Sequence, residues 1–338
     1  MRGDSLQSVA RLLARGRDSG GSSALICYHR GPDIDALGSA CAMSLALSSL
    51  GVSNFVLRPD VIPACILAHV DGVDFAELPA RDEPLPGLVV ALDSAESGRI
   101  PAELLAHMGK GPVFVNIDHH VSNPLWGDCN LVDPDSPSTT ALLCELLEEM
   151  GVEISPAIAS LLYAGLLTDT GCFCFTNTTA KTMRVASELI SNGASPWELA
   201  RALYYSRPFS RVLFQACAIS QARLCLGGRV SLLALSEDFI EQHSATKEDM
   251  EGLVEDLKGI EGVSCAVFLR ETSDGVRGSL RSKGPSFDVD KIASIFGGGG
   301  HSAAAGFLSS KGIVDLEEEL LAELSKFWEE GGGPLTSR

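Results

Sequence analysis

The sequence predicts an α/β protein with a parallel sheet in its first half and a smaller α+β domain in its second half. Up to about residue 170, short β-branched apolar runs alternate with helical patterns, which is typical of βα units whose sheet is covered on both faces. A length of 338 residues suggests two domains, at roughly 150 residues per domain. We expect a first domain at 1–185, a helical connector at 186–226, a second domain at 227–330 and a tail at 331–338.

The first half shows its elements through apolar periodicity. Leu6, Val9, Leu12 and Leu13 recur at helical spacing and predict a first amphipathic helix. Three short buried strands are expected at 23–28, 88–92 and 113–117, and they lead to His29, Asp93 and Asp118. Helices are expected at 36–50, with a first turn that begins at Asp35, at 139–150 and at 156–167, the last leading to Asp169.

The second half begins with a helical pattern at 181–224, without obvious strand signals. Beyond Gly227 and Gly228 we expect a strand at 230–235, a helix at 247–257, and a hairpin of 265–270 with 276–281. The segment 315–330 predicts an amphipathic helix with an acidic, solvated face, and the tail 331–338 is expected to be disordered.

The composition restricts the classes of partner. The chain carries 26 Lys+Arg against 44 Asp+Glu, a formal charge of −18, whereas duplex-DNA affinity rests on cationic side chains that neutralise phosphates. We therefore expect no long DNA and no membrane as a partner. The chain has no uncharged apolar stretch of about 18 residues and no signal-peptide pattern. Ten cysteines without a CxxC pair favour reduced thiols in a cytoplasmic protein.

Histidines and aspartates gather in four short segments: His29-x₃-Asp33-x-Asp35, Asp93, Asp118-His119-His120 and Asp169. Ligands of open α/β sheets bind beyond the carboxyl ends of the strands, so we expect one shared site. Carboxylates this close repel one another unless cations lie among them. Mixed His and Asp ligands without Cys suit Mn²⁺, Fe²⁺, Zn²⁺ or Co²⁺, and the excess of carboxylates favours Mn²⁺ or Mg²⁺. The number of ligands predicts two ions about 3.5–4 Å apart that activate a bridging water. A helix cap is the alternative role for a single Asp of this kind.

A second polar motif lies in the predicted C-terminal domain. Four glycines, 297–300, precede His301 and leave backbone N–H groups unobstructed, so a loop here can enclose an anion. Ser279, Arg281 and Lys283 alternate along the predicted hairpin strand and share one face. They belong to a run of seven residues with three cations and no acid. We predict a phosphate clamp, in preference to a flexible linker beside a solvated edge strand.

These segments together resemble the motifs of a known family. HRGPDIDALGS (29–39), ALDSAESGR (91–99), IDHHVSN (117–123) and LLTDTGCFCFTNTT (166–179) are similar, in this order, to the four motifs of the DHH phosphoesterases. GSLRSK (278–283) and FGGGGHSAAAGF (296–307) resemble the DHHA1 domain that follows them. Ile34 departs from the pattern, because the family usually has Gly between the two aspartates. The length resembles the NrnA-like group of bifunctional oligoribonucleases and pAp phosphatases.

The resemblance implies a role for each matching residue. His29, Asp33 and Asp93 would hold one Mn²⁺, and Asp35, Asp93, His119 and Asp169 a second, with Mg²⁺ or Co²⁺ as substitutes. His120 would face the scissile phosphate as electrophile or proton donor, and Asp118 would orient His119 or its neighbour. Substrate would also be bound, across an interdomain cleft, by Ser279, Arg281, Gly298, Gly299, Gly300 and His301.

The activity that the resemblance implies is hydrolysis of short oligoribonucleotides and of 3′-phosphoadenosine 5′-phosphate (pAp) to nucleoside monophosphates. Two alternatives stay open: a cyclic-di-AMP or pApA phosphodiesterase of the same fold, and a catalytically inactive nucleotide-binding regulator. The sequence mark of such a regulator would be a lost ligand, and every ligand position is filled here. A homodimer is compatible with the sequence.

Overall fold

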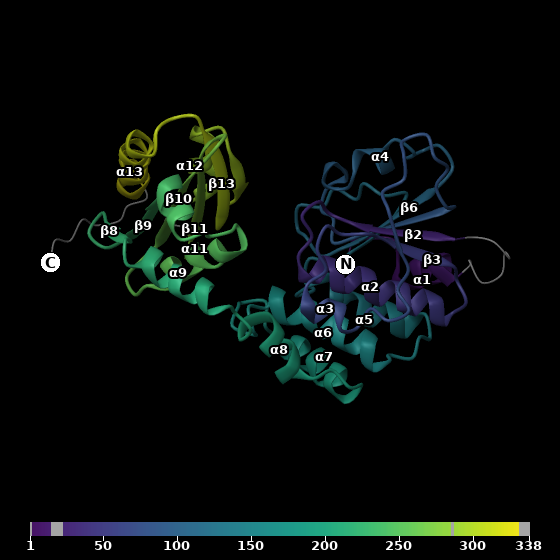
Figure 1. Ribbon diagram of the computed structural model, residues 1–338. Coiled ribbons are helices and arrows are strands. Elements are labelled where there is room, and N and C mark those ends of the chain that lie inside the picture. Colours follow the sequence, from purple (N-terminus) through teal and green to yellow (C-terminus); the bar gives the residue numbers. More distant parts are fainter. Residues whose placement is uncertain (1, 15–22, 285–286, 331–338) are drawn as a thin grey trace. The chain divides into compact units, whose positions relative to one another are not determined.

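A computed structural model describes residues 2–14, 23–284 and 287–330 of the chain (Figure 1). The tail predicted to be disordered, 331–338, lies outside the described residues. The chain forms two compact units, Met1–Ser206 and Arg207–Arg338. The boundary between them falls inside the segment predicted as a connector. Across the described residues, no helix combines the length and the apolar character needed to cross a bilayer.

The first unit is built on a seven-stranded sheet in the order β1-β7-β6-β5-β2-β3-β4. Six strands run parallel, and β1 pairs antiparallel with β7 at one edge. The three predicted strands are confirmed as the central β2, β5 and β6. The bounds are β1 (Arg2–Gly3), β2 (Ala24–Tyr28), β3 (Asn54–Leu57), β4 (Phe75–Ala76), β5 (Leu88–Leu92), β6 (Val113–Asp118) and β7 (Cys129–Val132).

Helices cover both faces of this sheet, and in Figure 1 α2 and α4 lie on opposite sides of it. One face packs on α1, α2, α5 and α6, and the other contacts α4. The bounds are α1 (Leu6–Ala14), α2 (Ile34–Ser49), α3 (Ala64–Leu67), α4 (Ala102–Leu105), α5 (Thr139–Glu149), α6 (Pro156–Asp169), α7 (Ala180–Ser191) and α8 (Pro196–Tyr204), with a 3₁₀ turn at Ser97–Arg99. The four helices predicted in this half are confirmed to within a few residues.

Two glycines allow α2, α5 and α6 to approach one another closely. A Cβ atom at Gly38 would lie 2.7 Å from the carbonyl oxygen of Leu161, and one at Gly165 would lie 2.5 Å from Thr140 and 2.6 Å from Asp35. Helix α2 begins earlier than predicted, because Asp33 caps it by accepting a hydrogen bond from Ala36 N at 3.0 Å. The close packing fixes the N-terminal turn of α2 beside the strand ends.

The second unit holds a six-stranded sheet in the order β12-β13-β11-β10-β9-β8. The predicted strand β9 and the hairpin β10–β11 are confirmed, and β9 and β10 run parallel. The strands are β8 (Arg223–Cys225), β9 (Val230–Leu235), β10 (Cys265–Thr272), β11 (Gly275–Ser282), β12 (Gly299–His301) and β13 (Ala304–Ser309). The helices are α9 (Phe209–Ile219), α10 (Glu237–Gln242), α11 (Leu253–Gly259), α12 (Val289–Ile295) and α13 (Ile313–Glu330).

Three predictions for this unit are wrong. The expected helix at 247–257 is divided into a 3₁₀ turn at Glu248–Met250 and α11, because Gly252 adopts a left-handed φ of 90° between them. The glycine-rich segment is not a free loop, since its end forms β12 and pairs with β13. The segment expected to stay helical to 224 ends in strand β8, which pairs with β9.

Candidate metal centre

The predicted His and Asp residues gather at the carboxyl ends of the central strands. Strands β2, β5 and β6 are neighbours in the sheet, so the residues at or just beyond their ends, His29, Asp93 and Asp118, come close together. The start of α2 adds Asp33 and Asp35, and α6 ends on Asp169. The ends of five elements of the first unit, β2, β5, β6, α2 and α6, therefore converge on one place.

Asp93 lies at the centre of this cluster. Its side chain faces three histidines: Oδ2 is 3.5 Å from His29 Nε2, and Oδ1 is 3.6 Å from both His119 Nε2 and His120 Nδ1. The residue has a left-handed φ of 52° and donates its backbone N–H to the Ile117 carbonyl at 3.0 Å. Aspartate is among the few residues that adopt this conformation readily. The turn after β5 thus aims one carboxylate at two neighbouring sets of ligands.

Three groups of side chains place ligand-type atoms within 4.8 Å of one another. The first joins His29, Asp33 and Asp93, and the second joins Asp35, His119 and Asp169. A third group adds His120 to Asp93 and His119. The six residues predicted as metal ligands are therefore brought together.

Asp35 is held rigidly in the second group. It is fully buried, and it accepts hydrogen bonds from the backbone N–H of Thr139 at 2.7 Å and of Thr140 at 3.0 Å. The Thr140 hydroxyl donates a third hydrogen bond at 2.6 Å. In the same group, His119 Nε2 lies 3.3 Å from Asp169 Oδ2.

The electrostatics of the cluster fit bound cations. Burial, followed by the nearby charge of Asp93, raises the pKa of Asp35 to about 8. Burial and the charges of Asp35, Asp33 and Asp93 raise the pKa of Asp169 to about 10. These carboxylates are costly to ionise together, and divalent cations among them would remove that cost. Burial also lowers the pKa of His119, which favours the neutral imidazole that binds metals. The donor set of carboxylates and imidazoles suits Mn²⁺ or Mg²⁺.

His120 belongs to a separate chain of hydrogen bonds. Its Nδ1 lies 2.7 Å from Asp118 Oδ1, and the other oxygen of the buried Asp118 accepts a hydrogen bond from Asn123 Nδ2 at 2.6 Å. Burial alone would lower the pKa of His120, but its hydrogen bond to Asp118 and the charges of Asp118 and Asp93 raise it. Because its Nδ1 is bonded to Asp118, His120 has only Nε2 left for another partner.

Several residues that hold the cluster were missed by sequence reasoning. Thr139 and Thr140 fix Asp35, and the Thr139 hydroxyl also donates to Asp93 Oδ1 at 2.9 Å. Ser136 accepts a hydrogen bond from His119 Nδ1 through its carbonyl, at 3.3 Å. The segment Ser138-Thr139-Thr140 shows the cap of α5 in the sequence, but nothing local signals the contact with Asp35, 104 residues away.

The predicted phosphate-binding residues lie in the second unit. Arg281 on β11 and His301 on β12 are both paired with Ala304 of the strand between them. Cross-strand partners point to the same face, so these two side chains lie in one row, about 9–10 Å apart at the usual strand spacing. Ser279 and Gly299 form the next such row, through Gly306.

The glycines of this motif have distinct surroundings. A Cβ at Gly298 would lie 2.2 Å from the Gly306 carbonyl oxygen, and one at Gly300 would lie 2.4 Å from that of Ala304. Gly299 and His301 are exposed. The glycines thus allow β12 to lie close to β13, a packing role that the sequence reading missed.

The basic run 277–283, predicted as part of the phosphate clamp, meets an acidic side chain in the folded unit. Arg281 Nε donates to Glu255 Oε1 at 2.6 Å, and Lys283 Nζ donates to the Ile260 carbonyl at 2.8 Å. Lys283 also lies just beyond the end of β11. The run 277–283 itself contains no acid, but α11 brings Glu255 to Arg281 from a distant part of the sequence.

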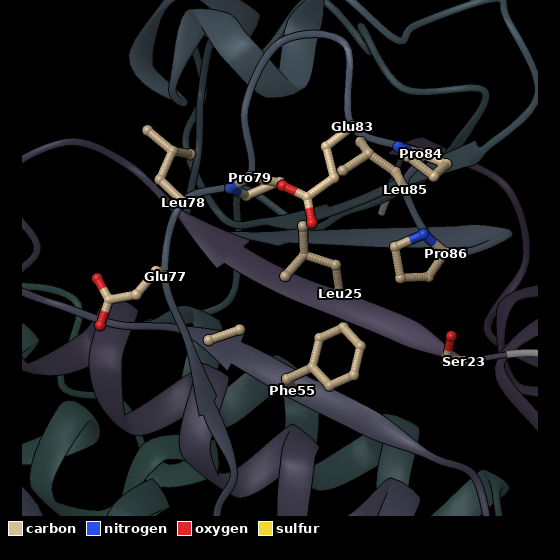
Figure 2. Close-up of a pocket in the computed structure, with 11 residues that line it drawn as sticks. Ser23, Leu25, Phe55, Glu77, Leu78, Pro79, Glu83, Pro84, Leu85 and Pro86 are labelled. Atoms are coloured by element: carbon tan, nitrogen blue, oxygen red, sulfur yellow. The ribbon is translucent and has the colours of Figure 1, made fainter.

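A cavity of about 560 Å³ lies at a different place in the first unit. It is lined by Leu25 and Phe55, near the starts of β2 and β3, and by the segment from Glu77 to Pro86 (Figure 2). Its lining residues are mostly of apolar type, with Glu77 and Glu83 as the carboxylates and no histidine among them. This cavity is separate from the metal-ligand cluster, which lies at the opposite ends of the strands.

Comparison with known families gives two matches along the chain. Residues 23–166 match the model of the DHH family, N-terminal domain, and residues 229–330 match that of the DHHA1 domain. The chain is 34% identical over 296 residues to a Thermus thermophilus protein named bifunctional oligoribonuclease and PAP phosphatase NrnA, covering 87% of this chain and 85% of that protein. A Bacillus subtilis protein of the same name is 31% identical over 312 residues, covering 89% and 93%.

Solved structures show the same fold. An exopolyphosphatase-related protein from Bacteroides fragilis superposes with a TM-score of 0.85 at 24% identity, covering 96% of this chain and 98% of the other. RecJ from Thermus thermophilus in complex with Mn²⁺ gives a TM-score of 0.59 at 15% identity, covering 96% of this chain and 55% of RecJ.

Proposed function

This chain belongs to the DHH family with a DHHA1 domain, and on that premise we propose that it is a Mn²⁺-dependent phosphoesterase that hydrolyses short oligoribonucleotides and pAp to nucleoside monophosphates. The names of its Thermus and Bacillus relatives support this substrate class. The observation that carries the proposal is the position of Asp93, whose two carboxylate oxygens face His29 and His119. A carboxylate placed in this way is suited to join two neighbouring metal sites.

The proposed ligands divide into two sets. His29, Asp33 and Asp93 would hold one Mn²⁺, and a second would be held by Asp35, Asp93, His119 and Asp169, with Mg²⁺ or Co²⁺ as substitutes. When bound, such ions lower the pKa of a water molecule and stabilise negative charge on phosphoryl oxygens.

The chain's own proton chemistry falls to His120. A buried carboxylate accepts hydrogen bonds, so Asp118 keeps a proton on Nδ1 of His120, at 2.7 Å. This leaves Nε2 of His120 to face the scissile phosphate and, when protonated, to donate to the oxygen that leaves. Asp118 is then a positioning residue, held in turn by Asn123.

The second unit would bind another phosphate of the substrate. Arg281 and His301 lie in one row of the sheet, which supports their joint action on an anion. Ser279, Gly298, Gly299, Gly300 and His301 complete the proposed set with Arg281. A need for two phosphates to be bound at once would restrict the enzyme to short substrates.

The test is hydrolysis by purified protein in the presence of Mn²⁺. We expect release of AMP from pAp and from pApA, loss of activity on chelation, and restoration by added Mn²⁺. The double variant Asp118→Ala/His119→Ala should be inactive, while Asp135→Asn, at an exposed site, should match the wild type. Full activity after chelation would contradict the proposal. Faster turnover of cyclic-di-AMP than of pAp would favour the phosphodiesterase alternative.

A further inference from the structure

We propose that Phe175 is a stacking platform for a nucleobase of the substrate, in the same unit as the metal-ligand cluster. This inference rests on the proposed function and deepens it, because it names a residue that would make the enzyme prefer nucleotides to other phosphate esters. Every base has a π-face, so stacking on an exposed aromatic ring is a sequence-tolerant way to bind short RNA.

The position of Phe175 ties it to the cluster. It lies in the segment that follows Asp169, and this segment folds back onto the end of α6. The backbone N–H of Phe175 donates to the Thr170 carbonyl at 3.0 Å, and that of Cys172 donates to the Leu167 carbonyl at 2.8 Å. The backbone of Phe175 is therefore tied to the helix end that delivers Asp169.

The segment is also fixed by a side chain. Asn177 Nδ2 donates to the Asp169 carbonyl at 3.1 Å and to the Pro137 carbonyl at 3.0 Å. Pro137 precedes the start of α5, which supplies the hydrogen bonds to Asp35. Phe175 thus lies on a loop that is bonded to two of the elements that build the cluster, so the backbone that carries its ring is positioned in advance of binding.

Phe175 differs from the other aromatic residue of the segment. Phe173 packs edge-on against Tyr163, at 6.0 Å between ring centroids, so it serves the core. Phe175 is 54% exposed. One side of its ring lies against Gly171, where a Cβ would come within 2.5 Å of the ring carbons. The ring is therefore supported on one side and accessible elsewhere.

Exposure alone does not make Phe175 functional, because single exposed apolar residues are common on protein surfaces. We therefore compare Phe175 with a second exposed apolar residue near the cluster. Val121 is 68% exposed and directly follows His120. It offers apolar surface near the same cluster but no aromatic face. Val121 is therefore a matched control, because its truncation changes exposed apolar area without removing a stacking surface.

The experiment compares Phe175→Leu, Phe175→Trp and Val121→Ala with the wild type, all loaded with Mn²⁺. The substrates are pAp, pApA and an abasic analogue of pAp that keeps the sugar and both phosphates. We expect Phe175→Leu to raise KM for pAp and pApA about 5- to 150-fold, the range for loss of one base stack, with little change in kcat. Phe175→Trp should restore the KM, and Val121→Ala should leave it unchanged.

The abasic analogue separates stacking from a structural role. Its KM should be the same for wild type and Phe175→Leu, since it has no base to stack. An equal rise of KM for pAp and for the analogue would overturn the inference, as would an unchanged KM for pAp. Circular dichroism and Mn²⁺ titration of Phe175→Leu confirm that the variant is folded and loaded.

Calorimetric measurement of AMP affinity tests stacking by Phe175 independently of hydrolysis, which tests the proposed function. If the wild type binds AMP but hydrolyses none of the substrates, the proposed function fails, and a weaker AMP affinity of Phe175→Leu still supports stacking. If hydrolysis occurs and the affinity for AMP is equal in both proteins, stacking by Phe175 is refuted alone. If the wild type neither binds AMP nor hydrolyses any of the substrates, both are refuted.

Discussion

The buried Asp118 and the partly buried His120 form a pair in which Oδ1 of the carboxylate lies 2.7 Å from Nδ1 of the imidazole. Asn123 donates to the second oxygen of Asp118 at 2.6 Å, and Asn123 also donates to Asn116 at 2.7 Å. The carboxylate therefore has little freedom to move. Since the pair fixes which nitrogen of His120 stays free, its effect should appear in catalysis more than in substrate binding.

The variant Asp118→Asn should test this. We expect kcat for pAp to fall about 10- to 100-fold, as is usual when a group that orients a functional histidine is replaced, with KM nearly unchanged. Steady-state kinetics in saturating Mn²⁺ measure the split. Asp135→Asn is the control, because Asp135 is exposed. A change confined to KM would show that Asp118 acts on binding instead.

Mn²⁺ should stabilise the fold. The raised pKa values of Asp35 and Asp169 reflect carboxylates that repel one another in a buried place. A ligand at about 100 times its Kd stabilises a protein by about 2.7 kcal/mol. We therefore expect a higher Tm with Mn²⁺ and a much smaller increase in Asp93→Ala, by scanning calorimetry. An equal increase in Asp93→Ala would remove Asp93 from the ligand set.

Gly165→Ala should weaken both the fold and metal binding. The added Cβ would lie 2.5 Å from Thr140 and 2.6 Å from Asp35, so α6 or the Asp35 side chain must shift. Overpacking of this kind costs about 1–3 kcal/mol. Gly87→Ala is the control, because a Cβ there meets no atom within 4 Å. Urea unfolding and Mn²⁺ titration give the two measurements, and equal behaviour of both variants would show that the close approach is unimportant.

Glu255 should restrain Arg281. Its carboxylate accepts from Arg281 Nε at 2.6 Å, so it competes with a substrate phosphate for the same guanidinium. Glu255→Gln should lower KM for pAp about 1.4- to 5-fold, which corresponds to the 0.2–1 kcal/mol of an exposed ion pair, and Arg281→Ala should raise it. Asp256→Asn on the same helix is the control. If both acidic variants behave alike, the effect is one of net charge.

Buried thiols should reduce stability at high pH. Burial raises the pKa of Cys27, Cys41 and Cys265 to about 12, from an ordinary value of 9.0. Between these values the unfolded chain loses protons that the folded chain keeps, so the free energy of unfolding falls as pH rises above about 9. Each thiol contributes roughly 1.4 kcal/mol per pH unit in that window. Urea unfolding at pH 8 and pH 10.5 measures the fall.

A cysteine variant isolates the thiol contribution from that of other groups. Cys41→Ala should show a smaller loss of stability between the two pH values than the wild type. The exposed Cys172 and Cys174 should react with iodoacetamide at pH 8 in the native state, and the three buried thiols should not. An identical pH dependence in Cys41→Ala would contradict the assignment.

The sequence predicts best the three central strands and the residues that follow them. Buried strands β2, β5 and β6 are continuous apolar runs, and the ligand-type residues after them stand out against such runs. Strands β3 and β7 were missed, because each is only four residues long and contains a buried asparagine, Asn54 or Asn130. Their place in the sheet depends on pairing with distant strands.

Contacts across long sequence separations limited the prediction of the site. Asp35 meets Thr139 over 104 residues, and Arg281 meets Glu255 over 26. No local pattern encodes either partner. The glycine-rich segment illustrates the same limit, because four glycines favour a loop locally, whereas pairing with β13 makes part of the segment a strand.

The edges of the two sheets have a consequence for how this chain behaves in concentrated solution. The first sheet ends in β1 and β4, each of two residues, and the second ends in β12 and β8, each of three. Long unpaired edge strands are templates on which other chains can add strands and aggregate. All four edges here are too short to offer such a template, so the native fold resists growth of its sheets from one molecule to the next.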